Sequence, residues 1–131
     1  MPQRLLIVDD SPVMHRLIAR IISTAALPIE CVSAASGRDA LDLLRQAKAD
    51  LILTDYHMPA MNGEEFIGML QQDPGLRDIP VVVMSTDATR ARVSRMAAAG
   101  VSGYLSKPFT PELLCKEITR ALGGCMDGVH D

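Results

Sequence analysis

Short runs of hydrophobic residues recur along the chain, separated by longer stretches with the spacing of amphipathic helices. Five runs have the length and composition of strands, and they cover residues 5–8, 29–34, 51–53, 81–84 and 101–105. Runs that are apolar on both faces suit the interior of a parallel sheet better than a strand with one face in water. The pattern therefore predicts five strands in a mostly parallel sheet.

The stretches between these runs carry signals of helix starts. A capping residue followed by proline, or by an acidic residue three positions later, is typical of the first turn of a helix. These signals are Ser11 with Pro12, Ser36 with Asp39, Asn62 with Glu65, and Thr110 with Pro111. We expect a fourth helix to begin at Asp87 and to end before Gly100, and the last helix to stop at Gly123.

The first of these helices has one continuous apolar stripe. Arg16 and Arg20 fall on the opposite, solvent-facing side. The predicted stripe consists of Met14, Leu17, Ile18, Ile21 and Ile22.

Alternation of strands and helices predicts an α/β fold in which helices cover both faces of the sheet. The 131 residues fit one domain, which we place at 1–122, with a frayed tail over 123–131. In such sheets ligands bind beyond the carboxyl ends of the strands, so the residues that follow each strand are the candidates for chemistry.

Charged and hydroxyl side chains stand at four of these strand ends. Asp9 and Asp10 follow the first strand, Asp55 the third, Ser85 the fourth and Lys107 the fifth. Three neighbouring carboxylates repel one another unless a cation lies between them, and an all-oxygen site suits Mg²⁺. Lysine and serine can bind phosphoryl oxygens, and an aspartate can act as a nucleophile. Each residue alone is more simply a turn former, a bonded hydroxyl or a surface charge, and only their joint placement favours a site.

Three stretches carry a resemblance to a known family. They are Leu-Ile-Val-Asp-Asp-Ser at 6–11, Asp-Tyr-His-Met-Pro at 55–59 with Asn62 and Gly63, and Gly-Tyr-Leu-Ser-Lys-Pro-Phe at 103–109. In their order and spacing the chain resembles a response-regulator receiver domain of the single-domain chemotaxis type, over about residues 5–122. The resemblance implies a flavodoxin-like sheet with strand order 2-1-3-4-5.

The resemblance also implies roles for the strand-end residues. Asp55 matches the phosphoacceptor, and Asp10 and Asp55 match direct Mg²⁺ ligands together with the backbone carbonyl of His57. Asp9 matches an acid that acts largely through water. Lys107 matches the lysine that pairs with phosphoryl oxygens.

Three further residues match the family pattern around that lysine. Pro108 matches a proline whose cis peptide bond with Lys107 aims the lysine inward. Ser85 matches the hydroxyl residue that turns toward the phosphoryl group, and Tyr104 matches the aromatic whose rotamer follows that movement.

The implied function is a switch and not a dedicated enzyme. A histidine kinase or histidine phosphotransfer protein would supply the phosphoryl group, and the output would be contact with another protein. Arg90, Arg92, Arg95 and Tyr104 would lie on the face made by the fourth helix, fifth strand and fifth helix, where the family often docks its targets. The plainer interpretation of the arginines is a solvated surface.

Residues beside the site depart from the commonest receiver pattern. Thr86 stands where many members have a smaller residue, and His57 occupies a variable position. Asp87 is shorter than a glutamate and so poorly placed to orient an attacking water. We expect these three residues to tune the lifetime of the phosphoryl group, with His57 and Thr86 shielding it, or His57 acting as a base.

Composition limits the remaining choices. A net charge of −3 argues against nucleic acid or an anionic membrane as a partner, and no apolar run approaches membrane-spanning length. Three cysteines without a paired motif give no sign of a disulfide framework. We expect a cytoplasmic protein that is monomeric or weakly dimeric. The alternatives are a receiver cut from a longer DNA-binding or enzymatic regulator, a phosphorylation-independent scaffold, and a phosphohydrolase, which would carry its nucleophile after the first strand.

Overall fold

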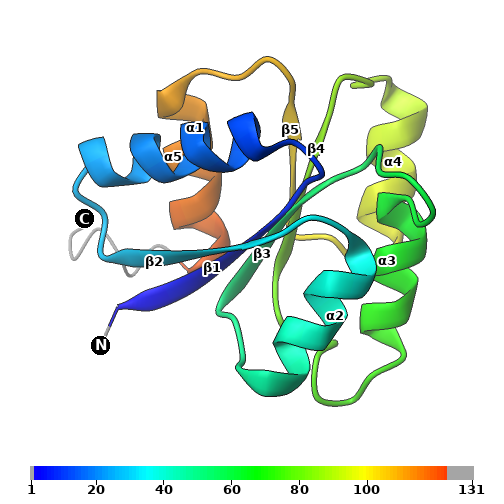
Figure 1. Cartoon of the computed structure of the whole chain (residues 1–131). Helices are drawn as coiled ribbons and strands as arrows, with labels where there is room; N and C mark the ends of the chain where they lie inside the picture. Colours follow the sequence, from blue (N-terminus) through cyan, green and yellow to red (C-terminus); the bar gives the residue numbers. More distant parts are fainter. Residues whose placement is uncertain (1, 124–131) are drawn as a thin grey trace.

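The computed structural model describes residues 2–123 and has five helices packed on a five-stranded parallel sheet (Figure 1). The strands are β1 (Gln3–Val8), β2 (Ile29–Ala34), β3 (Leu51–Asp55), β4 (Val81–Ser85) and β5 (Gly103–Ser106). The helices are α1 (Pro12–Thr24), α2 (Gly37–Gln46), α3 (Gly63–Gln71), α4 (Arg90–Ala98) and α5 (Pro111–Ala121). Apart from Gly123, the predicted tail lies outside the described residues.

The strand order is β2-β1-β3-β4-β5, which confirms the flavodoxin-like prediction. The register places Val8 beside both Ala34 and Thr54, and Ser85 beside Ser106. The carboxyl ends of the central strands are therefore level with one another. Residues that follow them must meet at one edge of the sheet.

Helices cover both faces of the sheet and create two separate hydrophobic cores. Helices α1 and α5 pack on one face, and α2, α3 and α4 pack on the other (Figure 1). Every residue of β3 and β4 is buried, because these strands are central and covered on both sides. The rigid strands β3 and β4 place Asp55 and Ser85 at their ends. None of the described helices has both the length and the apolar character needed to cross a bilayer.

Every helix begins at a side chain that accepts a hydrogen bond from a backbone N–H three residues later. The caps are Ser11, Ser36, Asn62, Thr89 and Thr110. At Asn62 the reciprocal bond from the Asn62 N–H to the Glu65 carboxylate completes a capping box.

The predicted start of the fourth helix is wrong by two residues. Thr89, and not Asp87, caps α4, because the Thr89 hydroxyl accepts the Arg92 N–H. The Asp87 carboxylate instead accepts the N–H of Thr89 at 3.0 Å, which makes a turn ahead of the helix.

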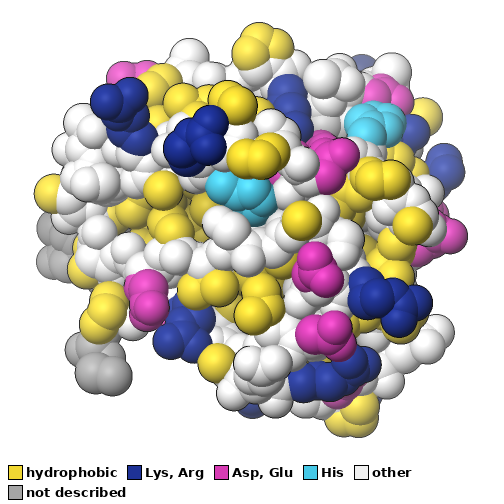
Figure 2. Space-filling model, in the orientation of Figure 1, with side chains coloured by type: hydrophobic (Ala, Val, Ile, Leu, Met, Phe, Trp, Pro, Cys, Tyr) yellow, Lys and Arg dark blue, Asp and Glu magenta, His cyan; other side chains and the backbone are white. Residues whose placement is uncertain are grey.

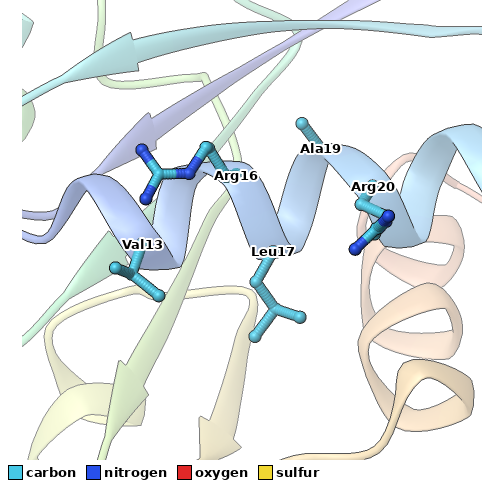
Figure 3. A pocket seen from close by; sticks show the side chains of 5 residues that line it. All are labelled: Val13, Arg16, Leu17, Ala19 and Arg20. Atoms are coloured by element: carbon cyan, nitrogen blue, oxygen red, sulfur yellow. The ribbon is translucent and has the colours of Figure 1, made fainter.

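The apolar stripe of α1 is narrower than predicted. Ile18, Ile21 and Ile22 are buried, but Leu17 is 43% exposed, because it stands at the edge of the stripe. Leu17 and Val13 point to the same side of α1 (Figure 3). A surface depression along this helix is lined by Val13, Arg16, Leu17, Ala19 and Arg20. Over α1, Figure 2 shows hydrophobic side chains beside basic ones.

Helix α1 ends in a Schellman motif that has alanine where glycine is favoured. The N–H of Ala26 bonds to Ser23 and that of Leu27 bonds to Ile22, and Ala26 has φ 57°. A Cβ atom in this left-handed conformation costs about 1 kcal/mol.

We therefore predict that Ala26→Gly raises the free energy of unfolding by about 1 kcal/mol, because glycine adopts a positive φ without a steric penalty. Urea denaturation with an unchanged m-value would measure the gain. Ala25→Gly is the matched control, since Ala25 has right-handed helical angles, and it should destabilise the protein. Equal losses from both substitutions would contradict the prediction.

Candidate functional site

Three carboxylates meet at the carboxyl edge of the sheet. One oxygen from each of Asp9, Asp10 and Asp55 lies within 4.8 Å of the other two. Asp9 and Asp55 are buried, whereas Asp10 is exposed. They meet because β1 and β3 are paired neighbours that end at the same level. The strand-end acids are thus brought together as predicted, with one side open to solvent. Figure 2 shows acidic and histidine side chains at this edge of the molecule.

Lys107, which follows the edge strand β5, also contacts this cluster. Its Nζ atom lies 3.1 Å from Asp55 Oδ1 and 3.2 Å from Asp9 Oδ2. The backbone of Lys107 is held to β4, because its N–H donates to the Ser85 carbonyl. The peptide bond from Lys107 to Pro108 is cis, as predicted. One ammonium therefore pairs with both buried carboxylates.

The positive charge of Lys107 does not fully compensate the negative charges of the three aspartates. Burial raises the pKa of Asp55 and the charge of Asp9 raises it further, while Lys107 and a hydrogen bond from the backbone of His57 act in the opposite direction. The net effect is a raised pKa. Three carboxylates and one ammonium leave two formal negative charges in excess, which favours a divalent cation.

The donor set fits a hard cation. All three side chains offer carboxylate oxygens, and Asp10 leaves the cluster open to solvent. Mg²⁺ is often held by one or two carboxylates while it retains several waters, whereas Ca²⁺ takes six to eight oxygen ligands. The three acids therefore match Mg²⁺ better than Ca²⁺. The role of the His57 carbonyl as a ligand stays a prediction.

Ser85, the last residue of β4, is fully buried beneath this edge of the sheet. Its hydroxyl accepts the N–H of Asp87 at 2.9 Å and lies 3.5 Å from Nε2 of His57. The half-buried Tyr104 donates its hydroxyl to the backbone carbonyl of the same Asp87. The two predicted switch residues are therefore connected through Asp87.

The three residues predicted to tune the lifetime lie around the site in different ways. His57 and Thr86 are exposed. The Asp87 carboxylate bonds to Thr89 and pairs with Arg92 at 3.4 Å, and the bonds from Thr89, assisted by Arg92, lower its pKa. Asp87 is thus directed toward α4.

The arginines of α4 differ from one another. Arg90 is exposed, and Arg95 lies 3.4 Å from Glu64 on α3. Arg92 turns inward, and its guanidinium carbon lies 3.8 Å from the centre of the Tyr56 ring. The three residues do not form one uniform basic surface.

His15 is a residue near the site that sequence reasoning missed. Its Nε2–H donates to the backbone carbonyl of Asp9 at 2.6 Å and so fixes the end of β1. Its position four residues after the Ser11 cap is the sequence signal that could have predicted this contact. Residues four apart lie on the same face of a helix, so His15 lies on the face that Ser11 presents beside the end of β1.

Similarity to known proteins identifies the family of this chain. The family model for the response regulator receiver domain matches residues 5–119. The chain belongs to this family. The receiver domain is 34% identical to chemotaxis protein CheY1 of Helicobacter pylori over 122 residues, which cover 92% of this chain and 97% of that protein.

Solved structures agree with this assignment. The receiver domain matches CheY4 of Vibrio cholerae with a TM-score of 0.84 and 30% identity, covering 92% of this chain and 99% of that one. It also matches the Mn²⁺-bound form of response regulator Rcp1 with a TM-score of 0.79 and 27% identity, covering 98% of each chain. The protein is a receiver domain of the CheY type and belongs to two-component signalling.

We predict that Asp55→Asn stabilises the metal-free receiver domain at pH 7, because it removes a carboxylate whose pKa is raised on folding, mainly by burial. A raised pKa means that the folded state binds more protons than the unfolded state, so ionised Asp55 lowers stability above its folded pKa. The penalty shrinks as pH falls and is gone below the unfolded value near 4.

Urea unfolding in a chelator at pH 7 and pH 4 would measure both parts of this prediction. Asp78→Asn, at an exposed position, is the control. A gain that is the same at both pH values, or a loss at pH 7, would refute the electrostatic origin.

Proposed function

We propose that this receiver domain accepts a phosphoryl group on Asp55 from a phosphohistidine of a histidine kinase or histidine phosphotransfer protein, and signals through contact with another protein. The observation that carries the proposal is the contact of Lys107 with both Asp55 and Asp9 inside the cluster of three acids. The proposed receiver domain spans residues 1–122.

Asp10 and Asp55 would hold Mg²⁺ directly, with the His57 carbonyl as a further ligand and Asp9 acting through water. The similar response regulator Rcp1 has a Mn²⁺-bound form, which supports the binding of a divalent cation by a protein of this kind. When bound, Mg²⁺ would neutralise charge on the carboxylates and on the phosphoryl oxygens.

The chain's own residues account for the transfer. A carboxylate oxygen of Asp55 attacks phosphorus, the phosphorus–nitrogen bond breaks, and its electron pair returns to the donor imidazole. The product is an acyl phosphate, whose oxygens Lys107 would pair with, and its contact with Asp55 supports this role. Positioning and charge compensation are the contributions of the protein.

Signalling follows if Ser85 changes its partner. Its hydroxyl now accepts the Asp87 N–H, and it would turn to donate to a phosphoryl oxygen on Asp55. Tyr104 would follow, because its hydroxyl is bonded to Asp87. A phosphoryl group shifts the population only through such differential contacts.

The rim residues would set how long the acyl phosphate lasts. His57 and Thr86 are exposed and would shield phosphorus from water, unless neutral His57 instead accepts a proton from the attacking water. Asp87 is engaged by Thr89 and Arg92, so it would be a poor residue for orienting that water.

The output partner would carry acidic groups and dock on α4, β5 and α5. Arg90 and Arg95 are exposed there, and Tyr104 lies on the adjacent strand. We propose a monomer or weak dimer without nucleic-acid binding, given the net charge of −3. A phosphorylation-independent scaffold is the alternative that the next experiment separates.

Incubation with acetyl phosphate and Mg²⁺ should produce a base-labile adduct on the wild-type chain, and Asp55→Asn should abolish it, because the nucleophilic oxygen is lost. Intact-mass measurement before and after mild base would quantify it. Asp78→Asn should label like wild type. Undiminished labelling of Asp55→Asn would refute the assignment, and no labelling of the wild type would favour the scaffold.

Substitution of Asp10 and substitution of Lys107 should have different effects on the affinity for Mg²⁺. Asp10→Ala should weaken Mg²⁺ binding by at least tenfold, because it removes a ligand, whereas Lys107→Ala should leave binding intact or tighter, because an ammonium repels the cation. Titration followed by the fluorescence of Tyr56 and Tyr104 suits a chain without tryptophan. Equal affinities of wild type and Asp10→Ala would contradict the proposed metal site.

A further inference from the structure

Asp87, in the loop between β4 and α4, is bonded to four different parts of the molecule. Its N–H donates to the Ser85 hydroxyl, and its carbonyl accepts the Tyr104 hydroxyl. One carboxylate oxygen accepts the Thr89 N–H, and the other pairs with Arg92 at 3.4 Å. The position of Asp87 therefore governs both hydroxyls that the proposed switch uses.

Arg92 is anchored in an unusual way for a residue on a surface helix. Its side chain is only 18% exposed, and its guanidinium carbon lies 3.8 Å from the centre of the Tyr56 ring. Nη1 of Arg92 is buried and has no hydrogen-bond partner among the described residues. Burial of a guanidinium is unfavourable unless other contacts compensate, and the ring face and the Asp87 carboxylate are the compensating groups.

The ring beneath Arg92 is itself fixed. Tyr56 directly follows Asp55, is 6% exposed, and donates its hydroxyl to Glu64 at 3.2 Å. Because Tyr56 is packed in the core under α3, it gives Arg92 a stable platform. Asp87 is thereby held to the end of β3 through Arg92, in addition to its bonds within the loop.

We propose that Arg92 is a positioning residue, which clamps the β4–α4 loop through Asp87 and Tyr56 in the conformation that holds the Tyr104 hydroxyl and engages the Ser85 hydroxyl. We call Arg92, Asp87 and Tyr56 the clamp. The clamp acts in the unphosphorylated chain. Its consequence for signalling rests on the proposed function, in which Ser85 turns from the Asp87 N–H toward a phosphoryl oxygen.

The clamp also separates Arg92 from its neighbours on α4. Arg90 is exposed and has no ion pair among the described residues, and Arg95 pairs with Glu64 at the surface. Substituting Arg92 should therefore act on the loop, whereas substituting Arg90 should not. A planar guanidinium can lie on a ring and pair with a carboxylate at the same time, which a lysine ammonium does less well.

Amide hydrogen exchange and tyrosine ring signals, measured by NMR on the unphosphorylated, metal-free chain, test the clamp. Arg92→Met keeps an unbranched apolar stem but removes the charge. It should speed exchange of the Asp87 amide by about five- to tenfold and move the Tyr104 ring signal toward that of a solvent-exposed tyrosine. Arg92→Lys should give a smaller effect, and Arg90→Met, the matched control, should give none.

A double-mutant cycle makes the test specific. Asp87→Asn retains an oxygen for the Thr89 N–H but removes the ion pair, so it should loosen Tyr104 by itself. Adding Arg92→Met to Asp87→Asn should then change little, because the two residues act as a unit. Additive effects, or an unchanged Asp87 amide and Tyr104 ring in Arg92→Met, would overturn the proposal.

If Arg92→Met also removes the exchange protection of the α4 amides, the single substitution Asp87→Asn becomes the deciding variant. A loosened Tyr104 ring with α4 still protected would support the clamp. An unchanged Tyr104 ring would overturn it. No phosphoryl group is involved, so failure of Asp55 to label would leave this result standing. Failure of the clamp would likewise leave the phosphorylation of Asp55 untouched.

Discussion

The rest of the site depends on the repulsion among three carboxylates that the sheet does not allow to separate. Asp9 and Asp55 stand at the ends of paired strands, and the register of β1 with β3 fixes their spacing. Lys107 compensates part of this charge by reaching both acids, but burial, together with the charge of Asp9, still raises the pKa of Asp55. A cluster with excess negative charge, buried on one side and open on the other, favours a hard cation and then a phosphoryl group.

This crowding is tolerated because the scaffold beneath it is rigid. The central strands β3 and β4 are buried along their whole length, with a hydrophobic core on each side. Contacts at the edge add to this, since His15 bonds to the carbonyl of Asp9 and the Lys107 N–H bonds to Ser85. The proposed movements are confined to the loop around Asp87, where side-chain bonds, and not core packing, hold the backbone.

The elements that were predictable from the sequence are those whose signals are local. The run 29–34 corresponds to β2 with the same bounds, and Asn62 with Glu65 forms the expected capping box. The meeting of Lys107 with Asp9, 98 residues apart, followed from strand order together with the family resemblance. Topology turns such a distant pair into neighbours, so a correct fold prediction was enough.

The features that could not be predicted depend on competition between two possible helix caps or on packing between separate elements. Asp87 and Thr89 are both good helix caps, and the bond from the Arg92 N–H to the Thr89 hydroxyl shows that Thr89 begins α4. Leu17 lies at the edge of the apolar stripe, where a small helix rotation decides its exposure. The inward turn of Arg92 depends on the ring of Tyr56, which lies on another element and has no periodic relation to it.

The central claim is that the crowded carboxylate of Asp55 becomes an acyl phosphate. Borohydride reduces an acyl phosphate to an alcohol, which would convert a phosphorylated aspartate into homoserine at its position in the chain. Reduction of the chain after treatment with acetyl phosphate and Mg²⁺, followed by peptide mass mapping, should find homoserine at position 55 and not at 9 or 10. Homoserine at another aspartate, or at none while the phosphoryl adduct is present by intact mass, would contradict the account.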